Sequence, residues 1–261
     1  MTNCKICKSE TKKYFEAQIL SKYLIAYYYC DTCGFLQTEK PYWLDEAYHA
    51  SITASDTGGL LRSLVLAETC SVLIYFLFDK NARYLDFAGG YGIFTRRMRD
   101  IGFDFYWQDG SSANLLARGF EYAEKMGRVE AVTSFESFEH FSDPLKEIET
   151  MLSFSRNIIF TTDLISSPVP KPEEWYYYGL HHGQHISFYS HRTLKYIADK
   201  YSLNYCNVRS LHFFTEKALD TAKTKLLLKM KRLGLFLFVK KNMTSKTAAD
   251  SIELIRRERI S

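Results

Sequence analysis

The sequence predicts an α/β protein in which helices cover both faces of a doubly wound, mostly parallel sheet. Three observations support this fold class. Apolar runs of strand length alternate with helical patterns between residues 83 and 215. A glycine-rich turn, Asp86–Gly92, ends the first of these runs and leads into a helical pattern. Two Cys-x-x-Cys pairs within the first 40 residues predict a small separate module before the sheet.

Length and composition limit the class of protein. A chain of 261 residues can hold one full α/β domain and a small appendage, and 46% hydrophobic residues suffice for a buried core. The net charge of +4 is too small to indicate a nucleic-acid partner. The first residues lack the apolar stretch of a secretory signal, and the apolar run Ser71–Phe78 is too short to cross a bilayer, so it is expected to be a buried helix. We therefore expect a cytoplasmic protein without a membrane partner.

The N-terminal cysteines have the spacing of a metal site. Two Cys-x-x-Cys pairs are separated by 22 residues, and the run Tyr23–Tyr29 is predicted to be a strand that leads into the second pair. Four thiolates would complete a tetrahedral zinc site with no open position, which predicts a structural zinc ion rather than a catalytic one. The alternative is four buried or redox-active thiols. Cys70 and Cys206 are expected in the core; the predicted zinc ligands are Cys4, Cys7, Cys30 and Cys33.

The remaining elements follow in order along the chain. Residues 1–40 form the predicted zinc module, residues 41–80 a connector with a helix at 57–78, residues 81–241 the core, and residues 242–261 a polar tail. Strands are expected at 83–87, 103–108, 129–134, 157–162, 203–209 and 211–215. Helices are expected at 92–101, at 113–126, after Asp143-Pro144, from Ser190 to about 201, and at 216–232, where the lysines are predicted to form a solvated face.

The glycine-rich turn indicates a nucleoside-containing cofactor. Small residues between a strand and a helix let the backbone approach a ligand closely. Asp109 ends the second strand, 23 residues after Asp86, where an acid can accept both hydroxyls of a ribose. A nicotinamide fingerprint would need a third glycine where Thr95 stands, and no Gly-Lys-Ser/Thr phosphate loop is present.

The pattern acid-x-small-x-Gly-x-Gly resembles the first motif of class I S-adenosylmethionine-dependent methyltransferases. This resemblance implies a seven-stranded Rossmann-like sheet. It also implies that Asp109 and the adjacent Gly110 lie at the ribose of the cofactor. Ala88 stands where the family usually has glycine. The resemblance assigns the following turn residues to the cofactor: Asp86, Ala88, Gly89, Gly90 and Gly92.

Three further segments extend the resemblance over most of residues 1–215. The segment 134–144 resembles the part of the family that follows strand four, with a Glu-His pair and a later Asp-Pro. The segment 183–190 resembles the His-Ile stretch before the next helix in many small-molecule methyltransferases. The N-terminal module resembles the zinc-binding domain of certain sugar C-methyltransferases, in which the segment corresponding to 46–51 reaches the cofactor.

Histidines are the candidate catalytic residues. Methyl transfer needs an electron-rich acceptor, and histidine is the natural base near neutral pH. Each candidate could instead be structural: a histidine could bond the backbone, and the aromatic run Trp175–Tyr178 could be loop packing rather than a sugar platform. Tyr48 and Phe135 are candidate walls for the sulfonium. The predicted catalytic residues are His140, His182 and His185, with Glu139 to orient a histidine or contact the acceptor.

Three functions remain open from the sequence. The first is methyl transfer to a small molecule, with a sugar or nucleotide sugar as the acceptor. The second is methylation of RNA or another nucleic acid, with the zinc module as a grip on the substrate. The third is a non-catalytic, cofactor-binding partner in a larger assembly. The residues do not specify the methylated atom or the oligomeric state.

Overall fold

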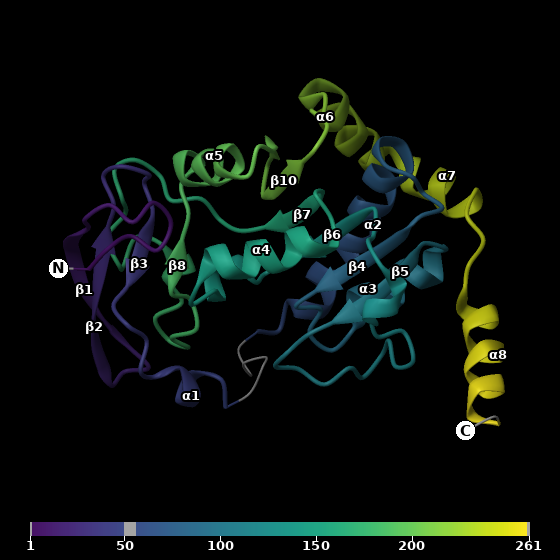
Figure 1. The fold of residues 1–261 in the computed structure, drawn as a ribbon, viewed down its shortest axis with the longest axis horizontal. Helices are drawn as coiled ribbons and strands as arrows, with labels where there is room; N and C mark the ends of the chain where they lie inside the picture. Colours follow the sequence, from purple (N-terminus) through teal and green to yellow (C-terminus); the bar gives the residue numbers. More distant parts are fainter. Residues whose placement is uncertain (1, 50–55, 260–261) are drawn as a thin grey trace. The chain divides into compact units, whose positions relative to one another are not determined.

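The computed structural model describes residues 2–49 and 56–259 (Figure 1). The chain divides into two compact units. Unit 1 comprises Met1–Thr53 and Phe135–Ala218, and unit 2 comprises Ala54–Ser134 and Leu219–Ser261. The cysteine segment thus belongs to one unit with residues far along the chain. The predicted domain boundaries stay a prediction.

Unit 2 contains the glycine-rich turn and three parallel strands. The order is β5 (Asp104–Gln108), β4 (Arg83–Phe87) and β6 (Ala131–Ser134). In this register Asp86 on β4 lies opposite Trp107 on one side and Thr133 on the other. Helix α3 (Ile93–Ile101) connects β4 to β5. These strands and α3 confirm the prediction for residues 83–134, apart from the segment between β5 and β6.

The predicted helix at 113–126 is wrong. The described residues of this segment form turns, an isolated bridge between Trp107 and Glu121, and the short 3-10 helix η1 (Glu124–Met126). Gly119 takes a positive φ of 84°, which a continuous helix does not allow. The backbone of Trp107 also exchanges hydrogen bonds with Phe120 and Tyr122, and this pairing requires extended chain. Tertiary contact with β5 therefore outweighs the local helical pattern.

Helix α2 (Gly59–Leu77) confirms the predicted helix before the sheet. Its second half is buried, including the stretch from Cys70 to Ile74, and it packs against α3, α6 and α7 within the unit. In length and composition the helix as a whole could cross a membrane, which the run Ser71–Phe78 alone could not. The core helix of a globular protein has the same features, and burial of residues 70–74 against three helices fits that reading.

The end of the chain is more helical than predicted. Helix α6 (Thr221–Met230) begins five residues later than expected, because the Asp220 carboxylate accepts hydrogen bonds from the first backbone amides. It continues through the kinked segment η4 (Lys231–Leu235) into α7 (Phe236–Lys241). The predicted polar tail contains a further helix, α8 (Thr247–Glu258), drawn in yellow in Figure 1.

A buried ion pair joins α8 to α3. Arg99 donates two hydrogen bonds to the two carboxylate oxygens of Asp250, at 2.8 and 2.7 Å, and both residues are at most 4% exposed. The guanidinium also donates to Asp104 and lies 3.7 Å from the ring centre of Phe120. The pair therefore connects the last helix to the parallel strands.

Replacing Asp250 by alanine is expected to lower the free energy of unfolding by about 3 kcal/mol, because Arg99 would lose two hydrogen bonds to a buried carboxylate and keep Asp104 as its acidic partner. Thermal unfolding would measure the change. Ser251→Ala, at an exposed position of the same helix, is the control and should unfold like the wild type. Equal unfolding temperatures for both variants would contradict this role of the pair.

Unit 1 contains an antiparallel sheet that begins at the cysteines. Its order is β1 (Lys12–Ile19), β2 (Tyr23–Tyr29), β3 (Leu36–Thr38) and β8 (Ser187–Phe188). Strand β2 has the predicted bounds. Strand β8 comes from the loop that breaks the strand–helix alternation, so the cysteine module and this loop share one sheet and one apolar core around Tyr27, Tyr178 and Phe188.

Unit 1 also contains a second set of strands in the order β7 (Ile158–Thr161), β10 (Leu211–Thr215) and β9 (Asn204–Val208), in which β10 is antiparallel to both of the others. These strands and the helices α4 (Pro144–Phe154) and α5 (His191–Lys200) match the predicted segments. Asp143 caps α4, and Ser190 forms a capping box on α5. Over the described residues of both units the α/β sheet is mixed and has six strands, so a mostly parallel seven-stranded sheet is not confirmed.

Candidate functional site

The turn after β4 in unit 2 has the backbone geometry of a ligand cradle. Ala88, Gly90 and Gly92 all have positive φ, at 56°, 53° and 80°. A Cβ on Gly89 would lie 2.7 Å from Trp107, and one on Gly92 would lie 2.8 Å from Asn114, so no side chain fits at either position. A Cβ on Gly90 would meet no atom of the described residues within 4 Å, so these residues leave the space beside this glycine open to a ligand. Gly110 is also open.

Ala88, which stands where the family usually has glycine, has a strained backbone conformation. A positive φ costs alanine about 1–2 kcal/mol, whereas glycine adopts it freely. Ala88 therefore holds a backbone conformation that glycine would adopt without strain.

Asp86 is buried beneath the turn. Its carboxylate accepts hydrogen bonds from Thr95 at the start of α3 (2.8 Å) and from Thr133 on β6 (3.1 Å). Burial raises the pKa of Asp86 to about 7, although the two threonine hydroxyls act in the opposite direction. The side chain is 2% exposed. Asp86 thus ties the turn to the neighbouring helix and strand.

Asp109 lies at the end of β5 and holds the same turn from the other side. One carboxylate oxygen accepts from the Gly90 amide (2.9 Å), and the other accepts from the amides of Ser111 and Ser112. A carboxylate offers about four acceptor positions, so at least one stays available to a hydroxyl. Of the residues assigned to the cofactor by resemblance, unit 2 brings together the turn, Asp109 and Gly110.

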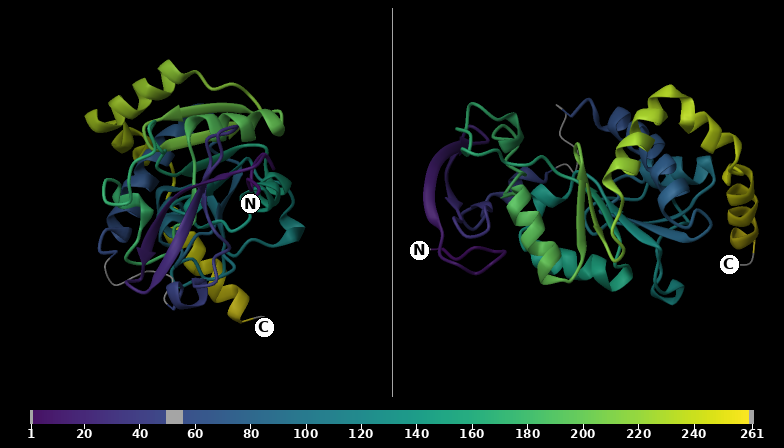
Figure 2. Two further views of the ribbon diagram at one scale, coloured as in Figure 1. Left: turned by 90° about the vertical axis from the view of Figure 1, so that its left-hand side faces the viewer. Right: turned by 90° about the horizontal axis from the view of Figure 1, so that it is seen from above.

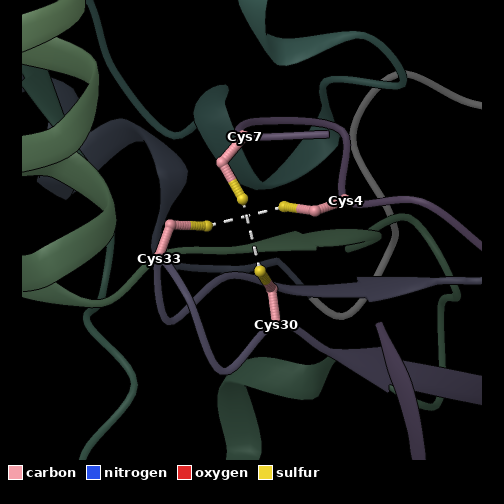
Figure 3. Close-up of side chains that lie close together, drawn as sticks. All are labelled: Cys4, Cys7, Cys30 and Cys33. Atoms are coloured by element: carbon pink, nitrogen blue, oxygen red, sulfur yellow. Dashed lines mark hydrogen bonds between the residues drawn. The ribbon is translucent and has the colours of Figure 1, made fainter. Parts of the chain in front are cut away.

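The four N-terminal cysteines converge on one point in unit 1 (Figure 3). Cys4 and Cys33 have sulfurs 3.5 Å apart, and Cys7 and Cys30 have sulfurs 3.4 Å apart. All four sulfurs lie within 4.8 Å of one another. Four thiolates bound to one zinc ion at ~2.3 Å would be roughly 3.8 Å apart, so the cluster needs only a small expansion to accept the ion. The hydrogen bond from Cys33 also lowers the pKa of Cys4 to about 5, and a thiolate is the form that binds metal.

The surrounding backbone supports this cluster. The hydroxyl of Thr193, on α5, donates to the Cys33 carbonyl at 2.9 Å. Gln37 on β3 accepts from the Lys5 amide and donates to the Asn3 carbonyl. Gly34 has a φ of 75° and lies so close to Ser190 that no Cβ fits. The other two cysteines, Cys70 and Cys206, are buried, as predicted.

A second cluster in unit 1 brings together the predicted catalytic residues. The rings of His140 and His185 are centred 4.9 Å apart, and those of His182 and His185 are centred 4.7 Å apart. The Tyr48 hydroxyl lies 2.8 Å from Nδ1 of His140. Glu139, on the same 3-10 turn η2 (Phe138–His140), is 1% exposed. We call Tyr48, Glu139, His140, His182 and His185 the histidine cluster.

Burial makes the histidine cluster nearly uncharged at neutral pH. It raises the pKa of Glu139 to about 8, with a further rise from the charge of Glu136. It lowers the pKa of His140 to about 4, and His182 adds to this effect. It lowers the pKa of His185 to about 3, and His140 adds to this effect. The imidazoles of His140 and His185 are therefore neutral at pH 7.

Backbone groups hold the cluster in place. The Tyr177 carbonyl lies 2.6 Å from Nδ1 of His185, and the Gln184 amide donates to Nδ1 of His182. The Gln184 side chain donates to the Ala47 carbonyl, next to Tyr48. Glu139, His140 and His185 also offer atoms within 4.8 Å of one another, the donor set of a divalent-cation site.

The aromatic run Trp175–Tyr178 is mainly packing. Tyr177 and Tyr178 are buried, and Trp175 packs against the apolar core around Tyr27, Tyr178 and Phe188 in unit 1. Tyr176 alone of the four is strongly exposed, at 82%, and its hydroxyl donates to Asp163. A platform for a flat substrate would thus be limited to Tyr176.

Several contributors to the site have no signal in the sequence. The supporting carbonyls of Ala47 and Tyr177 and the side chain of Gln184 act through hydrogen bonds that no residue type predicts. Another buried histidine, His212, is a core residue that bonds the Thr162 carbonyl and the Tyr205 hydroxyl. Phe135 is half-buried just after β6. In the segment 46–51, Ala50 and Ser51 lie outside the described residues.

Comparison with known proteins identifies the family. The sequence model of the methyltransferase domain matches residues 62–208, which is more than half of the chain. No curated protein matches the chain. Among solved structures, TnmH is 14% identical, with a TM-score of 0.47 over 67% of this chain and 60% of that protein. The chain thus spans less than two thirds of TnmH.

Two other solved structures are similar to the same degree. An O-methyltransferase family protein from Burkholderia thailandensis is 12% identical, with a TM-score of 0.46 over 67% of this chain and 68% of that one. The plantazolicin methyltransferase BpumL, in complex with SAH, is 14% identical, with a TM-score of 0.45 over 72% of this chain and 81% of that one. On the family match, the chain belongs to the methyltransferase-domain family.

Proposed function

We propose that this protein transfers a methyl group from S-adenosylmethionine to a sugar or nucleotide sugar, with a base from the histidine cluster. The open, glycine-lined turn beside Asp109 carries the cofactor assignment. The buried cluster of neutral histidines carries the assignment of the base. We further propose that Cys4, Cys7, Cys30 and Cys33 hold a structural zinc ion, and that the protein acts in the cytoplasm.

The turn residues would hold the cofactor without chemical change to themselves. The bound cofactor supplies a methyl group on a positively charged sulfur. Asp109 would accept a ribose hydroxyl, and the bare backbone at Gly90 and Gly110 would let the adenosine portion approach. Asp86 would act beneath the turn as a positioning residue, since it is buried. Tyr48 and Phe135 are proposed as aromatic walls for the sulfonium.

The histidine cluster would handle the proton of the acceptor. As the methyl group bonds to the acceptor atom, the bond from carbon to sulfur breaks and the acceptor loses a proton. We route that proton through Tyr48: the Tyr48 hydroxyl takes up the acceptor's proton and passes its own proton to Nδ1 of His140, 2.8 Å away. His182 and His185 would shape the site around it. Loss of the Glu139 proton, which is held with a pKa of about 8, would strengthen the base.

Two features support a sugar as the acceptor. The zinc module resembles that of sugar C-methyltransferases. Tyr176 presents an exposed ring next to the carboxylate of Asp163, and a ring face with a nearby hydrogen-bond acceptor suits a sugar. A panel of nucleotide sugars, incubated with the protein and S-adenosylmethionine and analysed by mass spectrometry, tests the proposal. A mass gain of one methyl group would support it, and methylation of RNA alone would contradict it.

Replacing Asp109 by asparagine is expected to weaken S-adenosylmethionine binding by about 10- to 100-fold, because a charge-assisted hydrogen bond contributes ~1.5–3 kcal/mol. Isothermal titration would measure the dissociation constant. Glu124→Gln is the matched control, since this carboxylate is exposed in the same unit. Equal affinity in both variants, with unchanged thermal unfolding, would contradict the role assigned to Asp109.

A further inference from the structure

The segment from α6 to α7 in unit 2 combines strong positive charge with exposed apolar side chains. Between Thr221 and Lys241 the sequence has seven basic residues and no acidic one. Six of the basic residues are exposed: Lys223, Lys225, Lys229, Arg232, Lys240 and Lys241. The segment is the olive-to-yellow pair of helices that precedes α8 (Figure 2).

One side of this segment is fixed to the rest of unit 2. Thr224 and Leu227 on α6, and Phe236 and Val239 on α7, are buried. Both helices pack against α2. Lys231 also forms an ion pair with Glu68 of α2 at 3.5 Å. The segment is thus an anchored surface rather than a loose tail.

The other side is apolar and has no protein cover in the described residues. Leu233 is 79% exposed and Leu237 is 67% exposed. Leu233 lies at the kink, where Gly234 takes a positive φ of 98°. Isolated exposed leucines are common, but here several occur within one short segment. The exposed apolar residues are Leu226, Met230, Leu233, Leu237 and Phe238; together with the six exposed basic residues they form what we call the basic–apolar surface.

We propose that the basic–apolar surface binds an anionic lipid membrane. Lysines near such a membrane are attracted to its headgroups, and leucine and phenylalanine side chains can enter the boundary of the acyl chains. A solvated lysine face, as expected from the sequence, would not present leucines at 67–79% exposure. Binding would hold the enzyme at a membrane surface without crossing it. The inference departs from the expectation of no membrane partner.

The composition favours lipid over nucleic acid. Nucleic-acid surfaces combine basic residues with polar and aromatic side chains that reach bases and phosphates. Here the side chains between the lysines are aliphatic, with Phe238 as the one exposed aromatic ring in the segment. An aliphatic side chain gains little against a phosphate backbone but gains free energy on leaving water.

Flotation of the full chain with vesicles tests the proposal. We expect the protein to float with phosphatidylcholine vesicles that contain phosphatidylserine, and to remain in solution with pure phosphatidylcholine vesicles. Added salt should weaken binding, because the lysines act through charge. The double variant Lys225→Glu/Lys229→Glu is expected to weaken binding at least about twentyfold, and Leu233→Glu about tenfold or more.

Controls come from α8, which is also exposed in unit 2. Arg256→Glu/Arg259→Glu matches the charge change, and Ile255→Glu matches the apolar change. These variants should float like the wild type. Thermal unfolding of every variant would verify folding. The proposal is overturned if the wild type floats no better with phosphatidylserine vesicles than with pure phosphatidylcholine vesicles. It is also overturned if the α8 variants weaken binding as much as the variants of the basic–apolar surface, or if the protein binds RNA in preference to the vesicles.

Discussion

Replacing Cys30 by serine is expected to release zinc from the protein and to lower the free energy of unfolding by at least about 3 kcal/mol. A structural zinc ion contributes ~10–16 kcal/mol in small domains, so the loss of one ligand in four has a large effect. For a chain of this size the expected fall in the unfolding temperature is roughly 6–12 °C. Elemental analysis of zinc and thermal unfolding would measure the two changes.

Damage at the cysteines should extend beyond the metal. Strand β3 directly follows Cys33 and pairs with β8, next to the histidine-bearing loop. The Cys33 carbonyl accepts the Thr193 hydroxyl at the start of α5. We therefore expect the variant to lose methyl transfer as well as stability, although no cysteine belongs to the histidine cluster.

Cys206→Ala is the matched control, because Cys206 is a buried cysteine of the same unit outside the metal cluster. It should retain zinc, with a small loss of stability from the missing sulfur. If wild-type protein purified without chelator contains no zinc, or if Cys30→Ser retains it, the four thiols have another role.

The sequence was most informative where structure is local. The strand at 83–87, the helix at 93–101 and the capped helices at 144–154 and 191–200 each carry their own signal in periodicity, glycine or caps. The glycine pattern is readable for the same reason, because a positive φ and the lack of room for a Cβ act on single residues.

Non-local pairing explains most of what the sequence missed. The segment 113–126 has a helical pattern, but hydrogen bonds between Trp107 and the chain at 120–122 hold it extended. Strand β8 is only two residues long, and only its partner β3, about 150 positions earlier, makes it a strand. No periodicity can reveal either feature.

The candidate site divides in the same way. Glu139 and the histidines could be named from the sequence, since few residue types can move a proton near neutral pH. Their charge state could not, because it depends on burial: the same residue type is a cluster member at 140 and a core residue at 212. The positive charge of residues 221–241 could likewise be predicted from the sequence. The exposure of the leucines in this stretch could not, because it depends on which side of the helices packs against α2.

Replacing His140 by asparagine is expected to lower kcat by about 100-fold or more, because a general base contributes ~10²–10⁴-fold. Binding of S-adenosylmethionine should remain largely unchanged, since the hydrogen bonds that hold the cofactor turn come from Thr95, Thr133 and Asp109 and not from His140. Single-turnover measurements with the acceptor found among the nucleotide sugars would give the rate. His191→Asn, an exposed histidine of unit 1, is the control and should keep the wild-type rate.

The protonation of His140 can be measured without any acceptor. Burial holds the pKa of His140 near 4, below the usual 6.5, so its ring should stay neutral through the physiological range. The unfolded chain binds more protons than the folded one between these values, and stability should therefore fall as the pH drops below about 6.5. Nuclear magnetic resonance of the histidine rings would follow His140 directly. In the turnover assay with the acceptor, added imidazole should partly restore methyl transfer in His140→Gly if the ring acts as a base. A purely structural ring would give no such rescue, because free imidazole can take up a proton but is not attached to the chain.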